Sequence, residues 1–466
     1  MNYSFWADEA YVAGLAAQLV LGKLSLLQAL NGISYQKLYV ATLAFFFKLF
    51  GISEFTARLP SIFAFVLGIA IMFLIAKKLS NIFGAIVSSL LFTFSHLNLA
   101  YATQAKPYVF LESITLFILL LLLKLSTEKD RKRIYMYHVG IIFLLFIATF
   151  LHTIGILMWI MYGVYLMQKI YTQKSTISFK TFGLAKLFIL TLIVGILSIV
   201  ALPYLKMKFL PYNNLYQVLK LFAYKYTFIS VCSALGFIWM FKKHKVIGVA
   251  LLTYSIGVLL MASFQQYIFN IRYVLTLFGV LFLYFGIFWA KVGERYQFKI
   301  GGKAVIPIVV MILIYTTGYK IVRWPQTYYS PNIDKYGDVQ IANYKDFYAQ
   351  LKHKFPDYKN LYVVNDTFDV EYWYFGRYSN AYFMKFTEKP YKHHTADAYV
   401  YGSLNDFKKI IKENPQGLLV MEDWQSFLPD DIKEYAKKNL RLEFRVESLR
   451  ESPDDPWPLA LYSWGF

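Results

Sequence analysis

Cysteine and charged side chains are both scarce in this chain of 466 residues. The one cysteine, Cys232, lies inside an apolar run, so the sequence has neither a disulfide framework nor a thiolate metal site. Charged residues make up 16% of the chain and hydrophobic residues 58%, more than a soluble domain needs for its core. The composition therefore predicts a polytopic membrane protein.

Acidic residues are also few, with 28 Asp and Glu against 48 Lys and Arg, for a net charge of +20. Such a balance can indicate nucleic-acid binding. Much of the positive charge, however, lies in short connectors between apolar runs, where membrane insertion and anionic lipid account for it. We therefore predict a lipid bilayer as a partner and no nucleic acid.

Apolar runs recur from about residue 57 to about residue 321, and each is roughly 17–21 residues long, which is enough to cross a hydrocarbon core. We predict about ten spanning helices, and hence an all-α polytopic membrane domain over residues 1–324. The predicted spans lie near 57–76, 82–100, 107–124, 134–150, 153–170, 183–203, 226–241, 246–264, 269–290 and 303–321.

The connectors predict the orientation, because cytoplasmic loops collect Lys and Arg. Every second connector is rich in these residues, beginning with Lys77-Lys78, and those connectors are assigned to the inside. The outward-facing segments are then the residues before 57, 101–107, the turn at His152, 204–225, 264–272 and everything after Trp324. We expect a multi-pass protein of the cytoplasmic membrane with its C-terminal domain outside.

The amino terminus carries two amphipathic stretches, near residues 9–21 and 35–50, that we expect to lie along the membrane interface. If the second stretch crossed the membrane instead, the basic loops would face out, which the charge bias disfavours. An outward-facing start at Met1 has no hydrophobic segment before it to carry it across. We therefore expect one further helix upstream of Asn2.

The C-terminal part, residues 325–466, reads as a soluble α/β domain, because charge becomes frequent there and no run reaches spanning length. Strand-like runs at 361–364, 398–401 and 418–421 alternate with helical patterns at 345–355, 404–413 and 429–440. Residues 442–448 and 459–464 predict a closing antiparallel pair. The aromatic run Tyr372–Phe375 can stack on sugars or belong to the core.

Two adjacent carboxylates, Asp8 and Glu9, face outward among aromatic residues. Poor solvation there would suit one of them to general base chemistry. Carboxylates are also common in the first turn of a helix, where they act as caps, so a structural role is open.

Lys106 and His152 are two further outward-facing candidates. Lys106 precedes a proline that begins the next span, where a cation and free backbone amides can bind phosphate, although it can instead extend to lipid headgroups. His152 lies in a tight turn between spans, where an ionisable group is functional by default, unless a backbone carbonyl or water satisfies it.

Arg272 lies about one turn inside a span, close to Gln265, Gln266, Asn270 and Tyr273. A buried guanidinium needs an anionic partner, and a phosphate held by two hydrogen bonds is one possibility. Glu9 or Glu112 is the structural alternative. Glu112, one turn below Tyr108, is itself an acidic candidate.

These residues occur in the order seen in GT-C-fold glycosyltransferases, and the chain resembles the bacterial family related to protein O-mannosyltransferases and lipid A aminoarabinose transferases. The resemblance covers most of residues 1–290. It rests on Phe5–Ala10, Ala57–Pro60, Gln104–Tyr108, His152 and Arg272–Tyr273.

The resemblance implies transfer of a sugar from a polyprenyl phosphate carrier to a lipid, glycan or protein acceptor at the outer face of the membrane. Asp8 matches the family's general base, and Glu9 the second acid. Lys106 stands where many members have Arg near the lipid phosphate, and Tyr108 matches the aromatic two positions on.

His152 and Arg272 match positions that line the same cavity in the family. Gln104 departs from the family, in which Glu is frequent at that position, and this puts a carboxylate role there in doubt. The implied reaction is direct displacement at the anomeric carbon, with Lys106 and Arg272 stabilising the leaving phosphate.

Two other classes share part of this pattern. A transporter or flippase also has many spans and few buried charges, but such proteins usually show two corresponding halves with broken helices, and the polar residues here gather at one face. A non-catalytic scaffold in envelope assembly would work through its soluble domain.

No cluster with metal-ligand spacing faces outward, and we predict that the reaction needs neither a metal nor another cofactor. Fixed cations would stabilise the leaving phosphate in place of a divalent ion. Treatment with a chelator should therefore leave the transferase activity intact. Complete loss of activity that added metal restores would contradict this prediction.

Overall fold

A computed structural model describes residues 4–31, 36–172, 213–264, 271–295, 342–393, 396–422, 427–447 and 458–466, and the two-residue strands β1 (Tyr328–Tyr329) and β2 (Asp338–Val339). The chain divides into two compact units. The terminal unit consists of Met1–Pro60 and Asp338–Phe466, and the helical unit of Ser61–Gly337. The structure thus groups the first 60 residues with the C-terminal domain. The domain boundary predicted near residue 324 lies outside the described residues.

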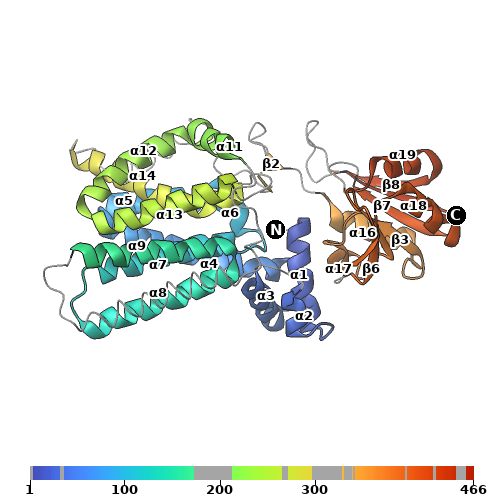
Figure 1. Cartoon of the computed structure of the whole chain (residues 1–466), viewed down its shortest axis with the longest axis horizontal. Coiled ribbons are helices and arrows are strands. Elements are labelled where there is room, and N and C mark those ends of the chain that lie inside the picture. The colour runs from blue at the N-terminus through green and yellow to red at the C-terminus, as the bar shows by residue number, and fades with distance from the viewer. Residues whose placement is uncertain are drawn as a thin grey trace. The chain divides into compact units, whose positions relative to one another are not determined.

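Long apolar helices lie side by side in the helical unit (Figure 1). Its helices are α4 (Glu54–Leu79, which begins in the terminal unit), α5 (Ile82–Phe94), α6 (His96–Ala102), α7 (Tyr108–Leu125), α8 (Arg131–Leu151), η1 (Thr153–Gly155), α9 (Ile156–Thr172), α11 (Leu215–Lys220), η4 (Leu221–Lys225), α12 (Thr227–Lys243), α13 (Lys245–Phe264), η5 (Ile271–Val274) and α14 (Leu275–Arg295).

Six helices in the described residues are long and apolar enough to cross a membrane, and a bent pair makes a seventh if it counts as one span. The six are Glu54–Leu79, Tyr108–Leu125, Arg131–Leu151, Thr153–Tyr171, Lys245–Phe264 and Ile271–Arg295, and the bent pair is Leu215–Ala223 with Thr227–Lys243. These helices coincide with seven of the predicted spans. The predicted spans near 183–203 and 303–321 lie outside the described residues.

The remaining predicted span, residues 82–100, was wrong as a single helix. Helix α5 ends at Phe94, and a second helix, α6, begins at His96. Ser95 separates them, because its backbone is not helical and its side chain accepts a hydrogen bond from the Asn98 N–H. A serine in a long apolar run thus acts as a helix start, which hydropathy alone does not register.

Glycines let α14 approach its neighbours closely. A β-carbon on Gly236 of α12 would lie 1.9 Å from the carbonyl oxygen of Tyr284 in α14. On the opposite side of α14, a β-carbon on Gly286 would lie 2.5 Å from the carbonyl oxygen of Gly84 in α5. Small residues of this kind allow helices in a membrane to pack backbone to backbone.

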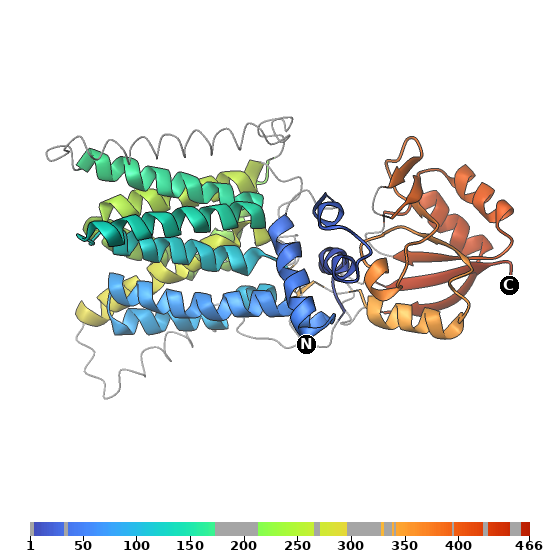
Figure 2. The same ribbon diagram turned by 90° about the horizontal axis from the view of Figure 1, so that it is seen from below.

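The terminal unit begins with three helices, α1 (Ala7–Val20), α2 (Leu26–Asn31) and α3 (Lys37–Phe50). Helices α1 and α3 correspond to the two predicted amphipathic stretches, and α2 was not predicted. Helix α1 packs on α3 and on a short helix of the C-terminal domain, α17 (Glu371–Tyr374), and buries most of its length there (Figure 2).

The C-terminal domain is built on a seven-stranded sheet of order β5-β6-β4-β3-β7-β9-β8. The four strands from β6 to β7 in this order run parallel, and the remaining strands pair antiparallel. The strands are β3 (Tyr362–Asn365), β4 (Ala381–Phe383), β5 (Tyr391–His393), β6 (Ala398–Tyr401), β7 (Gly417–Glu422), β8 (Arg441–Val446) and β9 (Leu459–Trp464).

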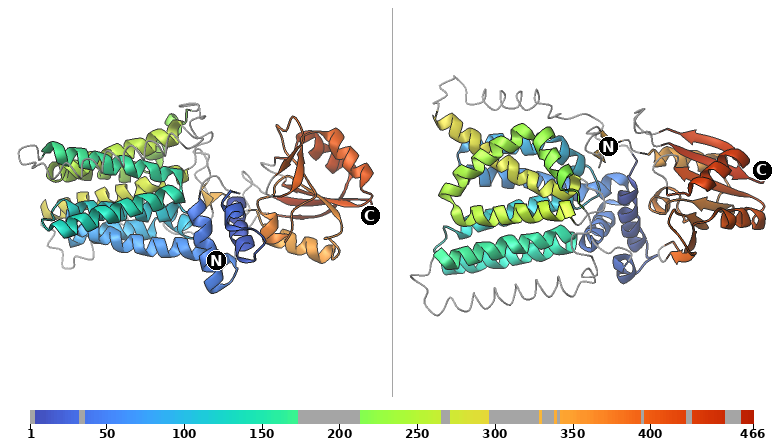
Figure 3. Two further views of the ribbon diagram at one scale, coloured as in Figure 1. Left: turned by 60° about the horizontal axis from the view of Figure 1, so that its bottom comes forward. Right: turned by 45° about the horizontal axis from the view of Figure 1, so that its top comes forward.

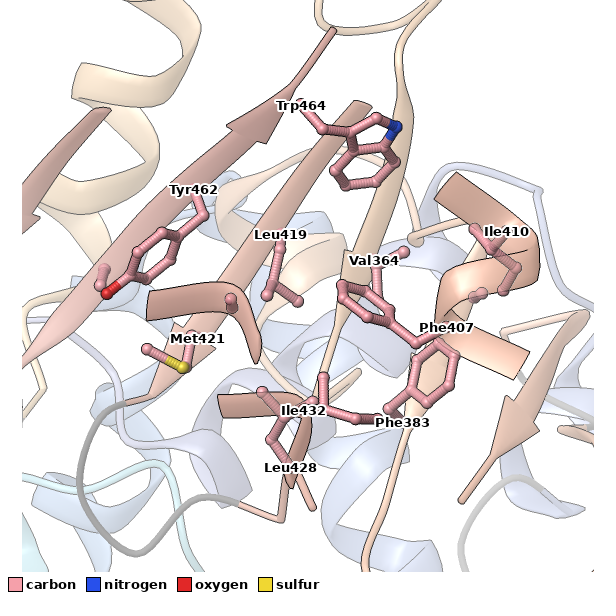
Figure 4. Packing of buried hydrophobic residues seen from close by; sticks show 13 residues of the cluster. Val364, Phe383, Phe407, Ile410, Leu419, Met421, Leu428, Ile432, Tyr462 and Trp464 are labelled. Atoms are coloured by element: carbon pink, nitrogen blue, oxygen red, sulfur yellow. The ribbon is translucent and has the colours of Figure 1, made fainter. Parts of the chain in front are cut away.

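Helices cover both faces of this sheet (Figure 3). Helices α18 (Leu404–Glu413) and α19 (Asp430–Asn439) pack on one face, where Phe407 and Ile432 meet side chains of the central strands (Figure 4). Helix α16 (Tyr344–Lys354) packs against the sheet through Phe347 and Phe444. Burial on both faces explains why every residue of β7 is buried.

All predicted strands and helices of this domain are present, and β8 and β9 form the predicted antiparallel pair. The prediction missed β4, β5 and α17. Each is only three or four residues long, too short for a helical or strand periodicity to develop.

Substitution of Gly236 by Ala should destabilise the helical unit, because the new β-carbon would overlap the backbone of Tyr284. Overpacking of this kind costs about 1–3 kcal/mol. Gly140→Ala is the matched control, since a β-carbon there lies at an ordinary 3.5 Å from Leu121. Thermal unfolding of the purified protein in detergent should show a clear loss of stability for the first variant and none for the control; equal stability would contradict the packing described.

Candidate active site

The adjacent carboxylates at the amino terminus lie in the first turn of α1, in different environments. Asp8 is half-buried, whereas Glu9 is fully buried. The two side chains predicted as one catalytic pair are therefore not equivalent, and Asp8 is the one that solvent or a substrate can reach.

Glu9 makes two structural contacts. One of its oxygens lies 3.6 Å from Nε of Arg58, near the start of α4, and both side chains are completely buried. The other oxygen accepts a hydrogen bond from the Trp6 N–H at 3.2 Å and so caps α1. The capping role that the sequence left open for this pair thus applies to Glu9.

Arg58 was not among the predicted site residues, although it stood in one of the motifs that carried the resemblance. Besides pairing with Glu9, its guanidinium lies 4.8 Å from the centre of the Phe5 ring. The sequence did contain a signal for this role. Arg58 is a charged residue at the start of an apolar span, and such a residue needs an acidic partner from elsewhere in the chain. The acid and the arginine together fix the course of residues 5–9.

In the helical unit, the predicted residues gather around the ring of Tyr108, the first residue of α7. The centroid of the His152 imidazole lies 5.4 Å from the centroid of the Tyr108 ring, and the guanidinium of Arg272 lies 5.8 Å from the same centroid. Tyr101 packs edge-on against the same ring. Arg272 also donates to the hydroxyl of Tyr273 at 3.3 Å. Three segments that are distant in sequence thus meet at one point.

Lys106 and Gln104 lie in the tight turn between α6 and α7, and both are buried. The turn is held in place because the Lys106 carbonyl accepts a hydrogen bond of 2.8 Å from the Ser61 hydroxyl of α4, and the Lys106 N–H donates to the Gln104 carbonyl. The backbone of this turn is thus fixed, and the Lys106 side chain is buried instead of extending to the surface.

His152 caps the turn between α8 and α9. Its Nδ1 accepts a hydrogen bond from the Ile154 N–H at 3.2 Å, which places the ring proton of the neutral form on Nε2. Burial, and then the charges of Arg272 and Lys106, lower the pKa of His152 to about 3. A neutral imidazole therefore lies beside two cations at physiological pH.

Glu112 is completely buried one turn along α7 from Tyr108. It packs against Gly279 of α14, where a β-carbon would lie 3.0 Å from its Oε1. Within the described residues, Glu112 forms no ion pair with Lys106 or Arg272, the structural pairing considered from sequence. Gln265, Gln266 and Asn270, the other polar residues predicted near Arg272, lie outside the described residues.

The arrangement around Tyr108 suits an anion, because the guanidinium of Arg272 and the neutral imidazole of His152 lie against one ring, and the charge of Lys106 acts on the same imidazole. The described part of the chain contains no group of three or more His, Cys, Asp or Glu residues that could hold a metal ion. The absence of a required metal nevertheless remains a prediction.

Removal of the Arg58 charge should strongly destabilise the terminal unit, because Glu9 would be left buried without its ionic partner. Breaking one side of a buried pair costs about 3–5 kcal/mol. We expect a large loss of thermal stability for Arg58→Met and a partial recovery when Glu9→Gln is added. A double variant no more stable than the single one would contradict the pairing.

The fold of this chain is similar to those of several solved structures over nearly its whole length. ArnT from Cupriavidus metallidurans in the apo state matches with a TM-score of 0.60 at 12% identity, over 99% of this chain and 94% of that one. ArnT bound to undecaprenyl phosphate gives 0.55 at 11% identity, with the same coverage. The oligosaccharyltransferase of Archaeoglobus fulgidus in the apo form gives 0.54 at 11% identity, over 90% of this chain and 66% of that one.

No protein-family model and no curated protein sequence matches this chain. At identities near 12%, structural similarity shows a common fold and does not by itself assign an activity. The sequence resemblance and the structural similarity nevertheless lead independently to the same fold. The chain has the GT-C fold of membrane glycosyltransferases.

Proposed function

We propose that this protein is a membrane glycosyltransferase that moves a sugar from a polyprenyl phosphate carrier to an acceptor. The observation that carries the proposal is the cation cluster around Tyr108, formed by Lys106 and Arg272 with the neutral His152. A cluster of this kind, in which Lys106 and His152 are buried and Arg272 is partly buried, matches the phosphate of a lipid carrier. The GT-C fold supports it, and one of the similar structures, ArnT, is bound to undecaprenyl phosphate.

Each residue of the cluster has its own part in binding the phosphate. Lys106 supplies a point charge, and its turn is fixed by Ser61. Arg272 supplies a planar guanidinium beside two tyrosine rings, and His152 supplies a neutral N–H donor. Gln104, Glu112 and Tyr273 complete the surroundings, as hydrogen-bonding groups for the donor.

Asp8 is the general base of the proposed reaction, and Glu9 is a positioning residue that acts through its pair with Arg58. Asp8 takes the proton from an acceptor hydroxyl, whose oxygen forms a bond to the anomeric carbon of the sugar. The bond from that carbon to the carrier phosphate breaks, and its electron pair leaves with the phosphate. Lys106 and Arg272 stabilise the negative charge that the phosphate gains.

The acceptor is a lipid, a glycan or a protein at the outer face of the cytoplasmic membrane. This part of the proposal rests on the alternation of basic connectors, which assigns residues 101–107, His152 and the C-terminal domain to the outer side. The sugar itself is a hexose or a pentose.

Asp8→Asn should abolish transfer without loss of carrier binding, because the amide keeps the size of the side chain and cannot accept the proton. Loss of a general base lowers the rate about 10²–10⁴-fold. The measurement is mass spectrometry of polyprenyl-linked sugars in cells that lack the native chain and express the variant. Unused donor should accumulate as it does in cells without the protein, while the purified variant still binds undecaprenyl phosphate.

Asp397→Asn is the matched control. Asp397 is exposed in the C-terminal domain and has a positive φ of 53°, a conformation that Asn adopts readily. It should restore normal levels of donor. If Asp8→Asn restores them equally well, Asp8 is not the base, and a scaffold that needs no chemistry becomes the better explanation.

A further inference from the structure

We propose that the C-terminal domain positions the candidate base: Trp373 and Tyr374 of α17 hold the segment of residues 4–9 that carries Asp8. This inference rests on the proposed function and goes beyond it, because it gives the C-terminal domain a role in the chemistry. All of the contacts that carry it lie within the terminal unit.

Trp373 packs between two phenylalanines of the amino-terminal segment. Its ring centroid lies 5.0 Å from that of Phe5 and 5.9 Å from that of Phe47 in α3. Phe5 is completely buried, with the Arg58 guanidinium also packed against its ring. Aromatic contacts of this type contribute about 0.5–1.5 kcal/mol each beyond the area that they bury. Phe5 therefore has little freedom to move while Trp373 is in place.

Tyr374 connects the same segment to the start of α4 through hydrogen bonds. Its hydroxyl accepts from the Phe5 N–H and donates to Glu54 at 2.6 Å. The second oxygen of Glu54 lies 3.4 Å from Lys345 of α16. Burial, followed by the charge of Glu54, raises the pKa of Tyr374, so the hydroxyl stays protonated and keeps its donor role.

Helix α17 is itself held firmly in the C-terminal domain. Its first residue, Glu371, is completely buried and accepts hydrogen bonds from Asn365 at the end of β3, from Ser379 and from Tyr382 of β4. Phe375 adds ring contacts to Tyr348 and Tyr358. A four-residue helix would not be ordered by itself, and these contacts supply the order.

Further contacts follow α1 along its length. Tyr11 packs on Phe368, and Gln18 donates to the hydroxyl of Tyr378 at 3.3 Å. The run that includes Tyr372 and Trp373 was left open in sequence as sugar-stacking or core, and in the structure it packs against α1 and α3.

The consequence for Asp8 follows from the short connection. Asp8 lies three residues after Phe5 and next to Glu9, in the first turn of a helix whose start is fixed by Trp373, Tyr374 and Arg58. A carboxylate that must accept a proton gains rate when its geometry is fixed before the substrate arrives, and a displacement of about 1 Å can cost 10²-fold.

The experiment uses the full chain with four substitutions. Tyr374→Phe removes only the hydroxyl, and Trp373→Ala removes the whole ring. Trp373→Phe restores an aromatic ring and tests rescue, and it remains informative if Trp373→Ala fails to fold. Tyr399→Phe is the matched control, since Tyr399 lies in the same domain and is half-exposed.

Two measurements are made on each purified variant. The first is hydrogen exchange at the individual amides of residues 4–11, which needs no activity and includes the Phe5 N–H. The second is turnover with the donor identified in the accumulation experiment, separated into kcat and KM.

Tyr374→Phe and Trp373→Ala should exchange faster at these amides and lose about tenfold to 10²-fold in kcat, with KM for the donor unchanged within about twofold. Trp373→Phe should recover most of the loss, and the control should match the native chain. A uniform loss of both kcat and donor affinity would indicate general unfolding and would overturn the proposal.

Unchanged exchange in a folded Trp373→Ala variant would overturn the proposal, as would faster exchange without any loss of kcat. Failure of the proposed function is distinguished by Asp8→Asn. If that variant retains turnover, the role of Asp8 is wrong whatever α17 does. If it loses turnover while the α17 variants retain theirs, only the present inference fails.

Discussion

The buried ion pair of Glu9 and Arg58 is the interaction on which the terminal unit depends. Neither charge contacts water, so each is tolerable in the interior only while the other is present. The pair forces the first turn of α1 to lie at the start of α4, and Phe5 then has a fixed place between Arg58 and Trp373. Asp8 is oriented as a result, because it immediately precedes the residue that is tied down.

A related principle, charge placed where water screens it only weakly, applies in the helical unit, where Lys106 is buried and Arg272 is partly buried. Burial, followed by the charges of Arg272 and Lys106, keeps the imidazole of His152 neutral, and both His152 and Arg272 pack against the ring of Tyr108. Cations that are desolvated and fixed before a ligand binds attract an anion more strongly than solvated ones. In the proposed reaction these side chains neutralise the phosphate of the lipid carrier.

Much of the fold could be predicted because two strong hydropathy patterns are present. Apolar runs of spanning length determine the long helices, and short apolar runs that alternate with helical patterns determine strands of the C-terminal part such as β7. The break at Ser95 could not be predicted, since a single capping hydrogen bond decided it. Helix α17 was missed for the opposite reason: its order comes from Glu371 and its neighbours, which are distant in sequence, and not from a local pattern.

The sequence by itself determined the class of the protein, the positions of the candidate charges and a resemblance in their order, because hydropathy and motif order are local properties of the chain. Only the tertiary structure decided that Glu9 pairs with Arg58, that His152 and Arg272 meet at Tyr108, and that Trp373 packs on Phe5. These pairings join residues that are tens to hundreds of positions apart. The chemistry of a side chain limits the kinds of partner that it can bind. Which of these partners lies within reach is determined only by how the helices pack against one another.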